Sequence, residues 1–187
     1  MQWYPLPVYR KVNVYEDVTY STATAYNNTF AQKYKFDFYE PLDDTTGQRP
    51  LVIMFCGGDF EQGSRKNKEV KTRCDSLARY GFTCAAVDYR LGYNTRNVGS
   101  AERAVYRSVQ DARAAIRYFK EFRNTFKIDT SLIFIGGDEA GAITAIHTAF
   151  LTKENQRAKS TYGISNEAKD LGCLDCSGNP FRHPTNV

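Results

Sequence analysis

Three short, mostly apolar runs of residues constrain the fold of this chain more than any other feature. They are residues 51–55 (LVIMF), 82–87 (FTCAAV) and 131–135 (SLIFI). A strand without a polar face is covered on both sides, as strands of a parallel sheet are. With 187 residues, the chain is long enough for one sizeable core, so we expect a single domain over residues 1–187.

Helical patterns separate the three runs. Asn67 is placed to cap a helix that ends at Gly81, and residues 101–126 repeat apolar side chains every three or four positions. A third helix is expected from Ala142 to about Leu151. Strands that alternate with helices predict a parallel α/β sheet with right-handed crossovers.

The two ends of the chain differ from this middle. Residues 11–20 and 32–40 alternate polar with apolar side chains, which predicts a pair of antiparallel strands at one edge. Residues 152–187 are rich in polar residues and predict a loop without a core of its own. The core is therefore expected over about residues 32–151, with residues 152–187 as a polar tail.

Composition narrows the class of protein. The chain has a formal net charge of +4, is 42% hydrophobic and 25% charged, and contains no apolar run of the roughly 18 residues needed for a membrane span. No secretory signal is recognised at Met1 to Pro5, which leaves the compartment open. Five basic residues are expected to form a solvated helix face and not a nucleic-acid site; they are Arg65, Lys66, Lys68, Lys71 and Arg73.

Each apolar run is followed by a distinctive segment. The segments are Cys56-Gly57-Gly58-Asp59-Phe60, Asp88-Tyr89-Arg90-Leu91 and Gly137-Asp138-Glu139-Ala140-Gly141. With Val109-Gln110-Asp111-Ala112, they resemble the esterase/lipase branch of the α/β-hydrolases, the carboxylesterase and hormone-sensitive-lipase-like group, over about residues 32–151. The resemblance implies an α/β-hydrolase fold whose remaining C-terminal strands are missing from this chain.

The third segment matches the Gly-x-Ser-x-Gly nucleophile elbow except at its centre. Small residues such as Gly137 and Gly141 are needed because the nucleophile sits in a tight strand-to-helix turn. Glu139 has no hydroxyl to deprotonate, so it cannot form an acyl-enzyme by the serine route. We therefore expect a homologue that does not hydrolyse esters in this form.

The resemblance also implies the oxyanion hole. Backbone amides of Gly58, Asp59 and Ala140 would form it, and Cys56, Gly57 and Asp138 would support the loop and the elbow. The Asp59 carboxylate would oppose the negative charge that such amides stabilise. The segment that contains Asp59 is thus a second reason to expect a loss of catalysis.

Two other uses of the site remain open. Glu139, or Asp138 in a shifted register, could serve as a carboxylate nucleophile. Alternatively, Asp59, Asp138 and Glu139 could hold a cationic or polyhydroxylated ligand without turning it over. The family's acid and histidine come after the elbow and are expected beyond Val187; His147 is expected to pack on its helix and His183 to be solvated.

The resemblance implies a small-molecule ester as partner and no metal or organic cofactor. Cys173-x-x-Cys176 and His183 lack a fourth zinc ligand, so a local disulfide or two free thiols is the preferred interpretation. Cys56 has no histidine nearby to activate it as a nucleophile. A parallel sheet that stops at the elbow strand would expose an edge, through which we expect self-association.

Overall fold

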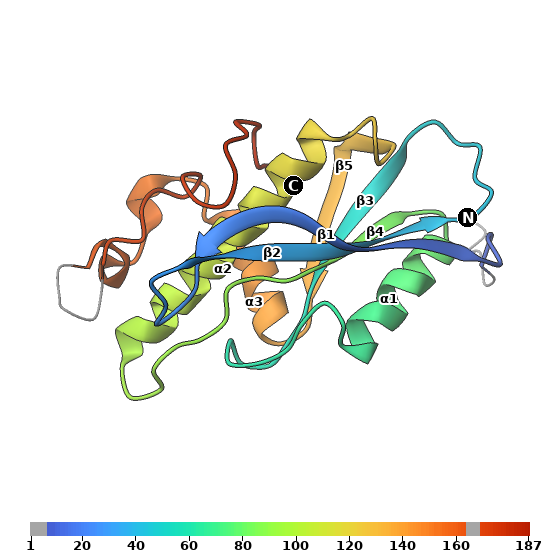
Figure 1. Ribbon diagram of the computed structural model, residues 1–187. Coiled ribbons are helices and arrows are strands. Elements are labelled where there is room, and N and C mark those ends of the chain that lie inside the picture. Colours follow the sequence, from blue (N-terminus) through green and yellow to red (C-terminus); the bar gives the residue numbers. More distant parts are fainter. Residues whose placement is uncertain (1–6, 164–168) are drawn as a thin grey trace.

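A mixed sheet of five strands carries helices on both faces in the computed structural model, which describes residues 7–163 and 169–187 (Figure 1). The expectation about a signal at Met1 to Pro5 lies outside these residues. The elements are β1 (Val12–Thr24), β2 (Ala31–Pro41), β3 (Arg49–Phe55), α1 (Lys68–Arg79), β4 (Thr83–Val87), α2 (Val98–Glu121), β5 (Ile128–Gly137), α3 (Ala140–Phe150) and the short 3₁₀ helices η1 (Glu154–Gln156) and η2 (Lys159–Tyr162).

The strand order is β1-β2-β4-β3-β5, in which β2 runs antiparallel to β1 and β4, and β4, β3 and β5 are parallel. This confirms the α/β sheet with antiparallel N-terminal strands. The connection through α1 steps from β3 to β4, and the connection through α2 steps back across β3 to β5. Right-handed crossovers in opposite directions place α1 and α2 on opposite faces of the sheet.

The register brings the three sequence segments together. Phe55, the last residue of β3, pairs with Val87 of β4 on one side and with Gly137 of β5 on the other. The segments that follow these strands therefore leave the sheet at the same edge. Ligands of open α/β sheets bind at this carboxyl edge.

Two details of the helices differ from the sequence patterns. Asn67 makes no side-chain cap of α1; its Oδ1 accepts the Ser64 N–H at 3.2 Å instead. The long helix α2 ends at Glu121 and not at Phe126. The aromatic stripe continues beyond it because Phe126 lies in a turn and packs against the rings of Phe36 and Phe38, 5.7 and 4.8 Å between centroids.

Two of the recognised segments meet in a buried ion pair. Arg90 follows β4 and is 5% exposed, and its Nε lies 2.9 Å from Asp111 Oδ1 on α2. The Asp111 carboxylate also accepts the Arg90 backbone N–H at 2.7 Å, and Gln110 Oε1 accepts the Arg90 guanidinium at 3.0 Å. Asp88-Tyr89-Arg90-Leu91 thus ties the loop after β4 to α2.

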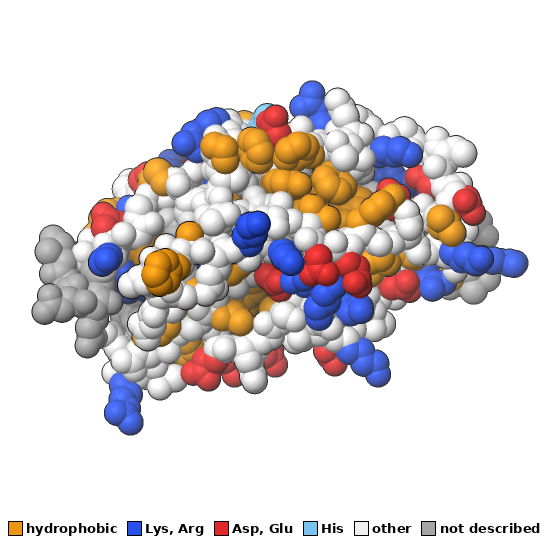
Figure 2. All heavy atoms as spheres, in the orientation of Figure 1, with side chains coloured by type: hydrophobic (Ala, Val, Ile, Leu, Met, Phe, Trp, Pro, Cys, Tyr) orange, Lys and Arg blue, Asp and Glu red, His pale blue; other side chains and the backbone are white. Residues whose placement is uncertain are grey.

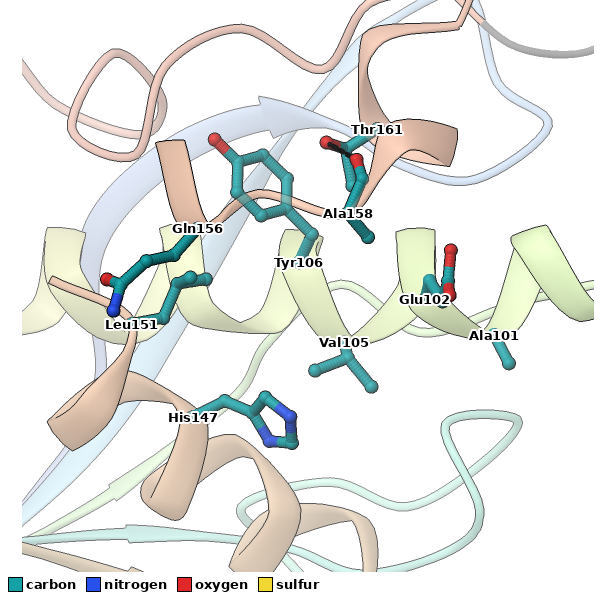
Figure 3. Close-up of a pocket in the computed structure, with 9 residues that line it drawn as sticks. All are labelled: Ala101, Glu102, Val105, Tyr106, His147, Leu151, Gln156, Ala158 and Thr161. Atoms are coloured by element: carbon teal, nitrogen blue, oxygen red, sulfur yellow. Dashed lines mark hydrogen bonds between the residues drawn. The ribbon is translucent and has the colours of Figure 1, made fainter. Parts of the chain in front are cut away.

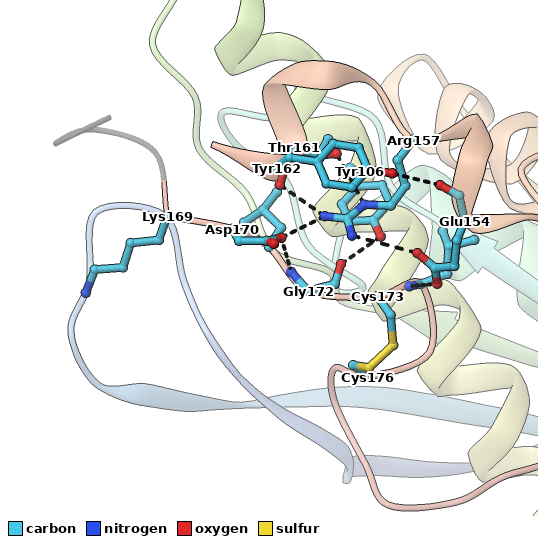
Figure 4. Close-up of polar contacts among 12 residues, drawn as sticks. Tyr106, Glu154, Arg157, Thr161, Tyr162, Lys169, Asp170, Gly172, Cys173 and Cys176 are labelled. Carbon is cyan, nitrogen blue, oxygen red and sulfur yellow. Dashed lines mark hydrogen bonds and ion pairs between the residues drawn. A yellow bond between two sulfur atoms is a disulfide. The ribbon is translucent and has the colours of Figure 1, made fainter. Parts of the chain in front are cut away.

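The polar tail, which was expected to have no core of its own, packs against α2. Leu174 is 2% exposed in a small cluster with Tyr106 and Val109, and Asp175 forms ion pairs with Arg113 and Arg117 of α2. Figure 4 shows the neighbouring contacts, in which Arg157 stacks on the rings of Tyr106 and Tyr162 and pairs with Asp170. The tail is irregular in conformation but belongs to the folded domain.

The β5 edge of the sheet and the outer face of α3 expose apolar side chains. On β5, Leu132 is 42% and Phe134 50% exposed; on α3, Ile146 is 59% and Phe150 76% exposed. On the face seen in Figure 2, hydrophobic side chains also gather beside a group of charged ones. Among the described residues, no helix is both long and apolar enough to cross a membrane.

Self-association through the β5 edge stays a prediction. Phe134→Lys places a charge on this edge, so we expect it to lower the mass that sedimentation equilibrium measures at high protein concentration. A wild-type chain that remains monomeric at every concentration would contradict the prediction.

Removing the buried partner of Arg90 should be costly. Asp111→Ala leaves the guanidinium buried without its carboxylate, so we expect the free energy of unfolding in urea to fall by about 3–5 kcal/mol. Asp75→Ala breaks the solvent-exposed Asp75–Arg79 pair and is the matched control, with little expected change. Equal stability of the two variants would show that the Arg90–Asp111 pair is not needed.

Candidate functional site

The loop after β3 is held in an unusual backbone conformation. Gly58 has φ +112°, and the next two residues, Asp59 and Phe60, have φ values of 55° and 62°. The loop then folds back on itself, because a Cβ on Gly63 would lie 2.3 Å from the Gly57 carbonyl oxygen. The N–H groups of Glu61 and Gln62 donate within the loop, to the Gly58 carbonyl oxygen at 2.9 and 3.1 Å.

The turn from β5 into α3 is equally tight. Glu139, at its apex, has φ 46° and ψ −113°, a conformation that side-chain-bearing residues rarely adopt. A Cβ on Gly137 would lie 2.5 Å from the Gly141 carbonyl carbon, and one on Gly141 would lie 2.3 Å from the Phe55 carbonyl oxygen. Glycine at both positions allows the turn to lie directly against the end of β3.

The two segments meet through a carboxylate. Oε2 of Glu139 accepts the backbone N–H of Gly58 at 3.1 Å. The fit is close, since a Cβ on Gly57 would lie 2.9 Å from the same oxygen. The Glu139 carboxylate is therefore hydrogen-bonded to a backbone amide of the loop after β3. This contact was not predicted from the sequence.

Asp138 is neutralised by a cation from the other face of the sheet. The guanidinium of Arg73 on α1 forms an ion pair with the Asp138 carboxylate. Sequence reasoning assigned Arg73 to a solvated helix face and missed this pair. Of the two carboxylates in the turn, Asp138 is therefore paired with Arg73. Among the described residues, no cationic side chain pairs with Glu139.

Arg65, in the loop between β3 and α1, was also assigned to a solvated helix face, and the structure shows that this assignment is wrong. It is 8% exposed, its Nε lies 3.0 Å from Asp37 Oδ1, and it also pairs with Asp17 and Asp88. Its backbone N–H donates to Asp88 Oδ1 at 2.8 Å. The sequence contained a hint of this burial: Asp17 and Asp37 interrupt the strands β1 and β2, and Asp88 follows β4.

Tyr89 supports the loop from the neighbouring strand. It is 3% exposed, and its hydroxyl donates to the Cys56 carbonyl oxygen at 2.8 Å. Burial, with the nearby Cys56 and Glu139, raises the pKa of Tyr89, so the phenol remains a donor. Through this contact, the segment after β4 supports the loop after β3.

Two cavities open on either side of Glu139. One, of about 560 Å³, lies toward α1 and is lined by both glycine segments with Asn67, Glu69, Arg73 and Asp138. The other, of about 320 Å³, lies toward α2 and is lined by Asp59, Phe60, Tyr93, Ala140 and Ile143. All the predicted site residues from Cys56 to Asp59 and from Gly137 to Gly141 thus lie at or beside one site.

Neither histidine contacts this site. His147 Nδ1 lies 2.9 Å from the carbonyl oxygen of Ile143, and His147 follows Glu139 by eight residues, a separation of about 12 Å along an α-helix. His183 Nε2 lies 2.6 Å from Glu121 Oε2, so it is paired and not simply solvated as expected. In residues 7–163 and 169–187, Glu139 therefore has no histidine beside it.

The cysteines show no metal-binding arrangement. Cys173 and Cys176 form a disulfide with Cα atoms 5.1 Å apart, so their sulfurs are not thiolate ligands. No group of three or more His, Cys, Asp or Glu side chains within the described part of the chain could hold a metal ion. Cys56 is fully buried, and burial raises the pKa of its thiol to about 11.

Cys56 should therefore resist alkylation. At about pH 8 its thiol is protonated and inaccessible, so we expect iodoacetamide to label it only after unfolding, as measured by peptide mass spectrometry. Because the folded pKa exceeds that of the unfolded chain, this group stabilises the fold fully below about pH 9 and loses the contribution as pH rises through about 11. Rapid labelling in the folded protein would contradict this description.

The close contact at Gly141 can be tested against a neighbouring glycine. Gly141→Ala forces a Cβ against two carbonyl oxygens of β3 and its loop, and we expect a loss of about 1–3 kcal/mol in the free energy of unfolding. Gly136→Ala is the control, since its Cβ would meet only the flexible Met54 side chain at 3.3 Å. Equal stability of both variants would contradict the packing described.

Comparison with known proteins agrees with this architecture. The solved structure of esterase Est2 from the Planctomycetes species Thermogutta terrifontis is similar at 26% identity and a TM-score of 0.56, covering 72% of this chain and 43% of that one. Brefeldin A esterase, described as a bacterial homologue of human hormone sensitive lipase, has 21% identity and a TM-score of 0.57, covering 86% and 41%. At that identity the second likeness shows the fold.

Sequence comparisons give the family. The curated neuroligin-like protein glit-1 of Caenorhabditis elegans is 32% identical over 94 residues, which are 50% of this chain and 12% of that protein. The chain thus spans a small part of that relative and less than half of the two structures. The BD-FAE family model matches residues 36–175. This chain therefore belongs to the BD-FAE family, in the esterase/lipase branch of the α/β-hydrolases.

Proposed function

We propose that the site around Glu139 binds a polar small molecule and does not hydrolyse esters through a serine-type acyl-enzyme. The observation that carries the proposal is the hydrogen bond from the Gly58 N–H to the Glu139 carboxylate, at 3.1 Å. In the esterase branch, the loop amide and the elbow would act on the same acyl group. Here an anion from the chain itself already holds that amide.

Electrostatics oppose an ester intermediate at this position. A tetrahedral intermediate would place a second negative charge next to the Glu139 carboxylate, and Asp59 lines the same side. Glu139 also lacks a hydroxyl to attack, and no histidine of the described residues contacts it. The hydrogen bond between Gly58 and Glu139 therefore supports binding of a ligand better than hydrolysis of an ester.

The ligand that fits this site is cationic or polyhydroxylated. The larger cavity is lined by Glu69, Asp138 and Glu139. Among the described residues that line it, Arg73 is the cationic one, and it is paired with Asp138. Carboxylates accept hydrogen bonds from ammonium and hydroxyl groups and repel anions. The esterases among the relatives suggest that the natural ligand has the size of a small ester.

A carboxylate nucleophile is the second candidate. The pairing of Asp138 with Arg73 leaves Glu139 as the carboxylate exposed at the apex of the turn. Attack by Glu139 would require it to leave the Gly58 amide, and would produce an ester linkage on this residue. A mass adduct on the peptide that contains Glu139 would replace the binding proposal with this one.

The test combines turnover with binding. We expect wild-type protein to leave p-nitrophenyl acetate unhydrolysed above buffer and to bind glucosamine saturably, with shifts of the Gly57, Gly58 and Gly63 amides in NMR spectra. Glu139→Gln removes the charge-assisted contact and should weaken binding by about tenfold or more. Glu61→Gln, in the same loop, is the control and should bind as wild type does.

Two outcomes would contradict the proposal. One is ester turnover by the wild-type chain that Glu139→Gln abolishes. The other is the same lack of glucosamine binding in wild type and in Glu139→Ala.

A further inference from the structure

Two buried cysteines lie against each other between α1 and β4. Cys74, on the buried side of α1, and Cys84, on β4, are both 0% exposed. Their Sγ atoms are 2.8 Å apart. Carbon atoms without a bond between them pack best at about 3.5–4.0 Å, and sulfur is larger than carbon. The two sulfurs are thus closer together than two separate thiols prefer.

The separation of these sulfurs approaches that of a covalent bond. Sulfur atoms in a disulfide lie about 2.05 Å apart, so a shift of about 0.8 Å would join Cys74 to Cys84. The helix α1 packs directly on β4, which pairs with β2 on one side and with β3 on the other. A bond here would therefore join a helix on the face of the sheet to one of its inner strands.

Other uses of a cysteine pair do not fit this position. Within the described part of the chain, no group of three His, Cys, Asp or Glu side chains could hold a metal ion, so the pair lacks further ligands. Burial raises the pKa of the Cys84 thiol well above its usual range, which makes it a poor nucleophile in the folded chain. A bond between the two sulfurs is the chemistry that remains.

The chain already carries a disulfide on the opposite face of the sheet. Cys173 and Cys176 close the loop that seats the buried Leu174 against α2. Figure 3 shows Gln156 and Thr161 of the same tail over the hollow of about 420 Å³ between α2 and α3. Disulfides form and persist where thiols are oxidised, so conditions that produce this bond also favour a second one.

We propose that Cys74 and Cys84 form a disulfide that fixes α1 to β4, with a small-molecule disulfide as the oxidant. Of the five cysteines, Cys56 then remains as the free thiol. The bond lies one residue after Arg73, which pairs with Asp138 of the turn, so it also holds this wall of the larger cavity in place. It does not depend on the proposed function.

The bond forms by exchange between the two thiols and the oxidant. The thiolate of one cysteine attacks the oxidant's disulfide, which gives a mixed disulfide and releases one thiol. The thiolate of the other cysteine attacks the cysteine sulfur of the mixed disulfide, and the second thiol leaves. The two cysteines lose two protons and two electrons, which reduce the oxidant to two thiols. Because both sulfurs are buried once α1 covers β4, the exchange takes place while the chain folds.

Peptide mapping tests the bond in the wild-type chain. The reduced, unfolded protein is refolded with reduced and oxidised glutathione, its free thiols are blocked with iodoacetamide in denaturant, and it is digested with trypsin. Cleavage at arginines places Cys74 on the peptide 74–79 and Cys84 on the peptide 80–90. We expect mass spectrometry to find these two peptides joined. If both carry the iodoacetamide label, or if either is joined to the peptide of Cys56, the proposal is overturned.

Thermal stability tests whether the bond fixes the helix. In Cys173→Ser/Cys176→Ser, refolding with the glutathione mixture instead of dithiothreitol should raise Tm by about 5–10 °C, because the loop of residues 74–84 is closed. The same variant with Cys74→Ser added is the matched control, and its Tm should be the same after both treatments. Each comparison uses one sequence, so any cost of the substitutions cancels. An equal Tm of both preparations of the first variant, or an equal rise in the control, overturns the proposal.

Discussion

The site depends on the direct contact between the β5–α3 turn and the end of β3. Gly137 and Gly141 lack side chains where a Cβ would come within 2.5 and 2.3 Å of other backbone atoms. The backbones can therefore approach closely enough for the Glu139 side chain to reach the Gly58 amide. A larger residue at either glycine would separate the two loops and remove that contact.

Buried charges hold the surrounding loops in place. Arg65 joins the glycine loop to Asp37 of β2, and Arg90 joins the loop after β4 to Asp111 of α2. Each of these two arginines is at most 8% exposed, so each depends on its carboxylate partner. These two pairs hold the loops around the site, and within the described part of the chain no cationic side chain pairs with Glu139.

Much of the fold was predictable, because a run of apolar residues indicates a buried strand. The three runs became β3, β4 and β5, and the alternating segments became β1 and β2. Contacts between distant residues were not predictable, because a charge pattern does not say which partner folding will bring near. Arg65 and Arg73 therefore looked like surface cations, and Asn67 looked like a helix cap.

The candidate site was predictable in its location and not in its geometry. Spacing of glycines identified the segments at Gly57 and Gly137, and the common edge of parallel strands brought them together. The hydrogen bond between the Glu139 carboxylate and the Gly58 amide could not be predicted from the sequence, because it depends on the backbone conformation at residue 139. Packing of the tail on α2 was missed for a similar reason, because it rests on single residues of the tail, the buried Leu174 and the ion-paired Asp175.

The pairing of Glu139 with Gly58 is tested most directly by following the Gly58 amide proton in NMR spectra during an acid titration. If the carboxylate accepts this N–H, protonation weakens the hydrogen bond, and the Gly58 resonance should move upfield in wild type and stay constant in Glu139→Gln. A Gly58 resonance that does not respond to acid in the wild-type protein, or that responds equally in both proteins, would contradict the account.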